Sequence, residues 1–254
     1  MLGICIALAG EQVIEDLHWK GQVQDAREVI ATEMAWNLEG AIRRMRTVRC
    51  AEQRLDSLAR ILDQASRSGS LPPVGDIGTP PPWRWRSGAW ESVVASQTAT
   101  HFPRQQLADF SDIYKIVERE QVNYLQEVAA WSDLYAMVGP GRRLDPASEA
   151  QLRSALSRAR VIGRNMATNS MFMVAGIRKI GLSFSRAELD GIAEVRTQSL
   201  TDDKPTAARP ATLSAICGPI GAVPPNYGEA ATNGLPALVD AAAKNLTDFG
   251  RAAP

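Results

Sequence analysis

The stretch Val23–Leu62, VQDAREVIATEMAWNLEGAIRRMRTVRCAEQRLDSLARIL, decides the fold of this chain. Its apolar residues recur every three or four positions, and this spacing places them on one face of an α-helix. The stripe comprises Val23, Ala26, Ile30, Met34, Leu38, Ala41, Met45, Val48, Leu55, Leu58 and Leu62. No proline interrupts it, so the sequence predicts one long amphipathic helix over residues 13–67, close to a coiled-coil seam.

The charges of the chain are balanced, and this limits the classes of partner. Lys and Arg number 28 and Asp and Glu number 28, so no net positive charge favours nucleic acid and we expect no nucleic-acid partner. Four arginines do cluster on the long helix, at Arg43, Arg44, Arg46 and Arg49. We interpret them as a solvated helix face; a patch for anionic lipid or nucleic acid is the alternative.

The rest of the chain divides into a connector, a group of helices and a tail. Residues 68–86 hold five prolines and predict an extended connector. Residues 87–198 show helical spacing and no convincing alternation of period two. Four helix starts are indicated by Ser87, Pro103, the Asp145–Pro146 pair and a Ser185–Glu188 capping box. The tail, 199–254, is rich in Pro and Ala. The predicted fold class is all-α: the long helix leads into a compact bundle of about four further helices.

The first twelve residues form an apolar stub whose role is open. Leu2–Gly10 is apolar, whereas a spanning helix needs about 20 apolar residues. The stub also lacks the basic region of a secretory signal. We expect it to be the outer half of a transmembrane helix that begins before Met1, with Glu11–Trp19 crossing the interface. A helix end packed on the domain and a cleaved signal are the alternatives.

Two segments carry a resemblance to a known group of proteins. They are EQVIEDLHWKGQVQDAREVIATEMAWNL, residues 11–38, and PPPWRWRSGAWESVVASQTATHFPRQQLADFSDIY, residues 80–114. Both resemble uncharacterised single-pass membrane proteins of proteobacteria, in which an apolar helix runs into a long charged helix. The resemblance covers residues 2–135. It implies an N-terminal anchor and a helical domain outside the cytoplasm, and it brings no known activity or functional residue.

The most unusual local chemistry is the segment Trp83, Arg84, Trp85 and Arg86. After three prolines the segment is extended, so its two indoles point to one side and its two guanidinium groups to the other. Such a surface can bind lipid headgroups, a single strand or a peptide. The alternative, which we favour, is a connector held on the bundle by its two indoles.

Three cysteines are present, and two of them form a candidate disulfide. Cys50 lies beside the stripe of the long helix and Cys217 lies in the tail, whereas Cys5 lies in the apolar stub. In an oxidising compartment Cys50 and Cys217 are the natural pair. Two unrelated reduced thiols are the equal alternative.

The sequence contains no recognisable catalytic set, cofactor motif or metal-ligand spacing. Only two histidines are present, His18 and His101, and no CxxC or HExxH pattern occurs. His101 precedes two carboxylates, Asp109 and Asp112, so the enzymatic hypothesis is a general base formed by His101 and a carboxylate. A capping or surface role for His101 is the simpler interpretation.

These observations lead to three ranked hypotheses for function. The first is an inner-membrane-anchored helical protein facing the periplasm, with a binding or scaffolding role. The second is a soluble cytoplasmic adaptor or regulator that dimerises through the stripe of the 13–65 helix. The third is a hydrolase-type enzyme with a carboxylate and His101 site.

Overall fold

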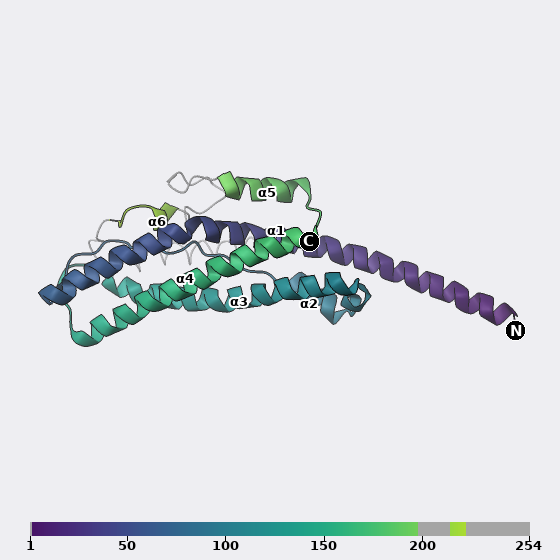
Figure 1. Cartoon of the computed structure of the whole chain (residues 1–254), viewed down its shortest axis with the longest axis horizontal. Helices are drawn as coiled ribbons and strands as arrows, with labels where there is room; N and C mark the ends of the chain where they lie inside the picture. The colour runs from purple at the N-terminus through teal and green to yellow at the C-terminus, as the bar shows by residue number, and fades with distance from the viewer. Residues whose placement is uncertain (1, 198–213, 222–254) are drawn as a thin grey trace, which may run out of the picture.

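The structure, a computed structural model, describes residues 2–197 and 214–221, with the side chains of 11–197 and 216–221. Most of the predicted tail, 199–254, therefore lies outside the described residues. The helices are α1 (Leu2–Ser68), α2 (Gly88–Ala95), α3 (Arg104–Leu134), α4 (Pro146–Ile180), α5 (Arg186–Thr197) and α6 (Ser214–Cys217). Two short 3-10 helices, Thr98–His101 and Tyr135–Met137, flank α3. The predicted all-α class is confirmed (Figure 1).

The apolar stub and the amphipathic stretch form one continuous helix, α1. Its N-terminal part projects beyond the other helices (Figure 1). Every side chain from Glu11 to Gln22 is exposed except half-buried Trp19, and from Glu11 onward Val23 is the first buried residue. Among the described residues, no helix carries an apolar stretch long enough to cross a membrane.

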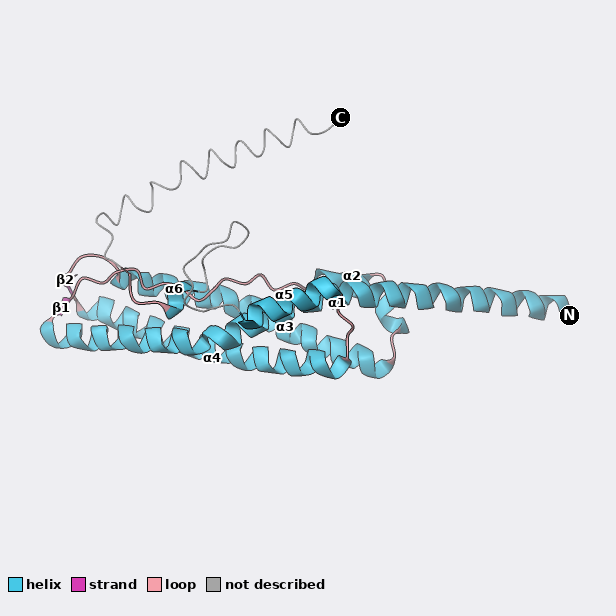
Figure 2. Cartoon of the chain, turned by 90° about the horizontal axis from the view of Figure 1, so that it is seen from above, coloured by secondary structure: helices cyan, strands magenta, loops and turns pink. Residues whose placement is uncertain are grey.

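The body of the bundle consists of α1, α3 and α4, with α4 packed on both of the others (Figure 2). Helices α3 and α4 are antiparallel, since Lys179 near the end of α4 pairs with Asp109 near the start of α3 at 2.8 Å. At the opposite end, Arg158 of α4 pairs with Asp133 of α3. Each helix buries the face that carries its apolar residues at spacings of three and four.

The boundaries of α4 and the start of α5 follow the local capping chemistry that the sequence predicted. The Asp145 side chain accepts hydrogen bonds from the backbone N–H groups of Ala147 and Ser148, both at 3.0 Å. Pro146 follows it at the first helical position, and Gly181 ends α4 with a φ of 68°. The reciprocal Ser185–Glu188 capping box begins α5. These predicted starts are confirmed.

The predicted connector is extended, and it adds a small sheet that the sequence did not indicate. Strand β1 (Ser70–Leu71) pairs antiparallel with β2 (Arg142–Arg143), the turn before α4. A further bridge joins Val74 to Gly139. With two residues in each strand, no alternation of period two is visible in the sequence. The sheet closes the end of the bundle that lies away from the N-terminus (Figure 2).

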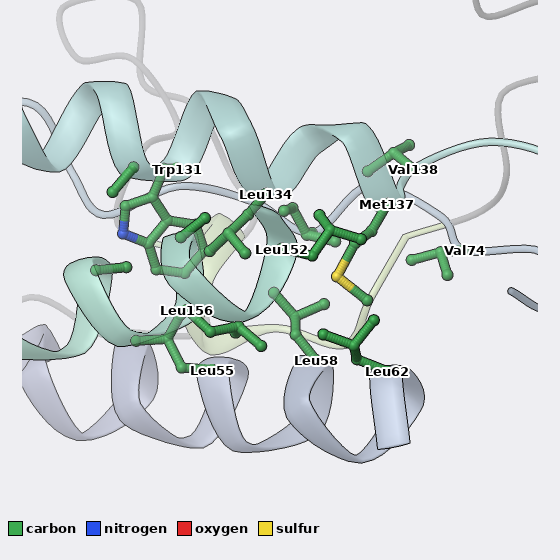
Figure 3. Packing of buried hydrophobic residues seen from close by; sticks show 14 of the residues in the cluster. Leu55, Leu58, Leu62, Val74, Trp131, Leu134, Met137, Val138, Leu152 and Leu156 are labelled. Atoms are coloured by element: carbon green, nitrogen blue, oxygen red, sulfur yellow. The ribbon is translucent and has the colours of Figure 1, made fainter. Parts of the chain in front are cut away.

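The core is divided into two apolar clusters along the bundle. The cluster far from the N-terminus joins Leu55, Leu58 and Leu62 of α1 to residues of α3 and α4 around Trp131 and Leu156 (Figure 3). The cluster nearer the N-terminus contains Ile30 and Met34 of α1, Phe110 and Val117 of α3, and Met173 of α4. Between the two clusters, the seam positions of all three helices carry polar residues.

The Cys50–Cys217 pair is present as a disulfide, with an S–S distance of 2.07 Å. It joins α6 to α1 across 167 residues of sequence. Ile216 beside it is buried in the core, and the Arg54 side chain donates to the Gly218 carbonyl at 2.6 Å. In the chain-entropy model a crosslink over such a loop stabilises the folded state by about 5 kcal/mol. The disulfide therefore fixes residues 214–221 on the long helix.

Candidate functional site

The segment Trp83–Arg86 has the alternating arrangement that the sequence predicts. Trp85 is buried, with 5% of its surface exposed, and Trp83 is half-buried against α1. Arg84 and Arg86 between and after them are exposed. The two indoles therefore pack on the bundle, and the surface that this segment presents is mainly cationic.

The Trp83 indole belongs to a stack of four side chains. It lies on Trp36 of α1, with ring centroids 4.6 Å apart. The Arg86 guanidinium carbon lies 3.7 Å from the Trp36 centroid, and that of Arg43 lies 5.2 Å from the Trp83 centroid. Gly40 makes room for this stack, because a Cβ there would lie 2.2 Å from the Trp83 ring. Stacked indoles flanked by two cations gain both dispersion and cation–π energy.

Polar side chains of α1 hold the backbone of the same segment. The Asn37 amide group donates to the Arg86 carbonyl at 2.7 Å and accepts from the Arg86 N–H at 3.0 Å. The Trp36 indole N–H donates to the Arg84 carbonyl at 2.7 Å. Asn37 is fully buried. An extended segment that lacks a partner strand thus has its backbone groups satisfied by helix side chains.

A buried carboxylate of α1 caps the next helix. Ser87, the predicted N-cap, makes no capping hydrogen bond. Glu33 instead accepts from the backbone N–H groups of Ala89 at 2.9 Å and Trp90 at 3.3 Å. The Tyr114 hydroxyl also donates to Glu33, at 2.7 Å, and burial together with this carboxylate raises the pKa of Tyr114. A negative charge at the N-terminus of α2 is favourable for the helix dipole.

The polar layer between the two apolar clusters is built around a buried ion pair. The Arg44 guanidinium donates to both carboxylate oxygens of Glu127, at 2.8 and 2.6 Å. Arg44 is 6% exposed and Glu127 is 3% exposed. The interpretation of the arginine run as a solvated face is therefore wrong for Arg44. The bidentate geometry satisfies both groups inside the bundle.

A second carboxylate, Glu120, lies one heptad before Glu127 and is fully buried. One of its oxygens accepts hydrogen bonds from the amide groups of Asn169 at 2.9 Å and Asn123 at 3.4 Å. Its other oxygen, and the hydroxyl of buried Ser170, have no hydrogen-bond partner among the described residues. Burial raises the pKa of Glu120 from 4.5 to about 7, against the lowering effect of the two amides and of Arg44. Glu120 therefore titrates near neutral pH.

A polar groove of about 780 Å³ lies on the surface of α3 and α4 beside Glu120. Asn123 and Asn169, which hold the Glu120 carboxylate, form part of its wall. The remaining lining residues are Lys115, Glu118, Arg119, Val122, Asn165 and Thr168. Two amides of the groove wall thus bond directly to the titrating carboxylate. A change in the charge of Glu120 is expected to alter how these amides are oriented.

The structure does not bring His101 together with the carboxylates that follow it. The His101 ring stacks on Trp19 of α1, with centroids 3.7 Å apart. Asp109 pairs with Lys179 instead. Within the described part of the chain, no group of His, Cys, Asp and Glu is arranged to hold a metal ion. His101 connects the base of the projecting helix to the 3-10 turn before α3, and the geometry gives no support to a general base there.

The polar layer leaves a signal in the sequence, in the form of charged residues at heptad positions of α3 and α1. On α3 the buried residues Ile113, Val117, Glu120, Glu127, Trp131 and Leu134 follow a heptad seam, so two carboxylates occupy core positions. Arg44 and Asn37 occupy equivalent positions on α1. Charged residues at seam positions are costly to bury unless they pair. This pattern indicates partners within the bundle, although it does not say which.

No protein-family model matches this chain, and no curated protein or solved structure matches it either.

Replacing Gly40 by Ala is expected to destabilise the protein, although Ala is the better helix former by about 1 kcal/mol. The added Cβ overlaps the Trp83 ring, so the stack must shift at a cost of roughly 1–3 kcal/mol. Gly21 on the same helix is the matched control, since nothing lies within 4 Å of a Cβ there. Urea unfolding should show opposite signs for Gly40→Ala and Gly21→Ala. Stabilisation by both changes would contradict the stack.

Removing one member of the Arg44–Glu127 pair should be far worse than removing both. We expect Arg44→Met or Glu127→Met to lower the free energy of unfolding by about 3–5 kcal/mol, because each leaves a buried charge unpaired. The double variant should lose much less than the sum. As a control, Arg186→Met breaks an exposed pair with Asp190 and should change stability by less than about 1 kcal/mol. Additive losses in the double-mutant cycle would refute the coupling.

Because the pKa of Glu120 is raised in the folded state, we expect the free energy of unfolding to fall as the pH rises. Its folded-state pKa is above its unfolded-state value, so between about pH 4.5 and 7 the folded state retains a proton that the unfolded state has released. The free energy of unfolding then falls with pH, by at most about 1.4 kcal/mol per unit. Urea unfolding of Glu120→Gln should lack this part of the slope. Glu118→Gln, an exposed neighbour, should keep it; equal slopes in all three proteins would exclude the assignment.

Proposed function

We propose that this chain is an envelope-associated helical protein with a binding or scaffolding role. In this proposal the N-terminal part of α1 attaches the protein to the inner membrane, and the bundle lies in the periplasm. The observation that carries the proposal is the Cys50–Cys217 disulfide. Disulfides persist in oxidising compartments, whereas cytosolic thiols are kept reduced.

The projecting part of α1 supports attachment at that end. Val13, Ile14 and Leu17 share one face of the helix and are 58%, 69% and 62% exposed. The apolar residues Leu2–Gly10 precede them on the same helix. Glu11 and Asp16 lie on other faces. A helix with an exposed apolar face next to charges is typical of a segment at a membrane interface.

The continuity of α1 supports a scaffolding geometry. Residues 2–22 of α1 precede Val23, which is buried in the bundle, and at 1.5 Å per residue they span about 30 Å. The helix contains no proline, so it connects its N-terminal end to the bundle as a rigid spacer. Anything bound to the bundle would be held at a defined distance from the membrane.

The alternative is a cytoplasmic adaptor that dimerises through the stripe of α1. This dimer would need the same side chains that α1 already packs against α3 and α4. Ile30, Met34, Leu55, Leu58 and Leu62 are each 2% exposed or less, because α3 and α4 cover them. A second chain could reach these positions only if the bundle opened. Self-association would have to use other surfaces of the described residues.

Cell fractionation tests the proposal with the protein expressed from its own gene. We expect it in the inner-membrane fraction, digested by protease added to spheroplasts, with Cys50 and Cys217 linked in nonreducing mass mapping. Val13→Glu with Leu17→Glu should release it from the membrane. Leu125→Glu with Val128→Glu, exposed apolar positions on α3, should not. Recovery from the cytoplasm with both thiols free would overturn the proposal.

A further inference from the structure

An apolar groove of about 660 Å³ lies between α1, α4 and α5. Its volume is within the range of small-molecule sites. Apolar side chains from all three helices and from the turn after α4 line it: Leu38, Ile42, Met45, Val174, Ile177, Leu182, Phe184 and Ile192. Most of them are only half-buried, so the groove exposes apolar surface to water. Filling it with an apolar group would remove that surface from water.

The way α5 is attached explains why the groove stays open. At its start, Glu188 accepts a hydrogen bond from Thr32 of α1. At its end, Arg46 of α1 donates to the Val195 carbonyl. Between these contacts Gly191 lies close to Glu39 of α1, since a Cβ there would be 2.6 Å from the carboxylate. Polar contacts thus hold α5 on α1, and the space toward α4 is left to the apolar side chains.

Cationic side chains mark the rim of this groove. Arg178 from α4 and Arg196 from α5 line it and are exposed, and half-buried Arg46 from α1 lines it as well. The lining residues in the described part of the chain include no Asp or Glu. The floor of the groove is apolar and the charges at its edge are all positive. Such a groove is complementary to a molecule with an apolar chain and an anionic head.

We propose that this groove binds a long-chain fatty acid. The acyl chain lies along the apolar residues from Ile42 to Phe184, and the carboxylate is paired with Arg178 and Arg196. This site goes beyond the proposed envelope role and does not depend on it, because the groove belongs to the bundle and can be tested on purified protein. Failure of ligand binding would leave the localisation result standing, and the reverse also holds.

Binding can be measured with the fluorescent fatty acid cis-parinaric acid and the purified, delipidated full-length chain. We expect one saturable site. Saturated fatty acids should displace the probe, with affinity rising about fourfold for each methylene that enters the groove. The methyl ester of the same chain should compete at least about tenfold less well, because it lacks the charge that pairs with the arginines.

Two variants locate the site. Arg178→Glu with Arg196→Glu should weaken binding at least about tenfold by placing like charges at the headgroup, whereas Arg67→Glu at the far end of α1 should not. Val174→Phe with Ile192→Phe should abolish it by filling the groove. Val13→Glu with Leu17→Glu should leave it unchanged, which separates the groove from the exposed apolar helix. Circular dichroism verifies that each variant is folded.

Three results from the probe, the competitors and the arginine variant would overturn the proposal. They are the absence of saturable probe binding, equal competition by acid and methyl ester, and unchanged affinity in the folded Arg178→Glu with Arg196→Glu variant. Loss of binding in the Val13→Glu with Leu17→Glu variant would also overturn it, because it would assign the probe to the N-terminal part of α1.

Discussion

The Arg44–Glu127 pair is the constraint on which the arrangement of the bundle depends. An arginine and a carboxylate, both nearly inaccessible to water, are stable there only while each satisfies the other. A shift of α3 by one turn against α1 would bury both charges unpaired. The apolar residues of the two clusters on either side of the pair select the register less strictly, because Leu, Ile and Met side chains pack acceptably in several helix registers. The ion pair therefore selects the register in which the two apolar clusters form.

Helix α1 also determines where the chain outside the three main helices lies. Glu33 caps α2, Trp36 and Asn37 hold the Trp83–Arg86 segment, and Cys50 holds α6. Most of these contacts join α1 to segments about 50 or more residues away in sequence. One rigid helix thus serves as the surface on which the connector and the end of the described chain are assembled.

Two features of the bundle bear on how it could respond to its surroundings. Glu120 is buried beside the polar groove and has a pKa near neutral pH, so its charge is sensitive to small changes in the environment. The apolar groove under α5 is separate from it and carries cationic residues at its rim. The raised pKa follows from the position of this carboxylate in the core. The open groove follows from the amphipathic helix α5, which is held by polar contacts at its ends. Neither feature involves the general base formed by His101 and a carboxylate, which was the enzymatic hypothesis from the sequence.

Several elements could be predicted because their causes are local. The spacing of apolar residues in Val23–Leu62 dictates an amphipathic helix, and Asp145, Pro146 and the Ser185–Glu188 box mark helix starts through bonds to neighbours in sequence. The Cys50–Cys217 pairing could be named only as one of two alternatives, since spacing along the chain does not measure distance in space. The inward direction of Trp83 and Trp85 followed from the alternation of an extended segment, but the identity of their partners did not.

The sequence by itself determined the fold class, the course of the long helix and most helix boundaries, because these depend on residues within one or two turns of each other. Only the tertiary structure decided that Glu33 rather than Ser87 caps α2, that Glu127 is the partner of Arg44, and that Gly40 makes room for Trp83. Each of these is a contact across about 40 or more residues, whose energy depends on burial and on a partner supplied by another element. Charge and side-chain type are visible in a sequence, whereas the removal of a group from water occurs only when the elements pack.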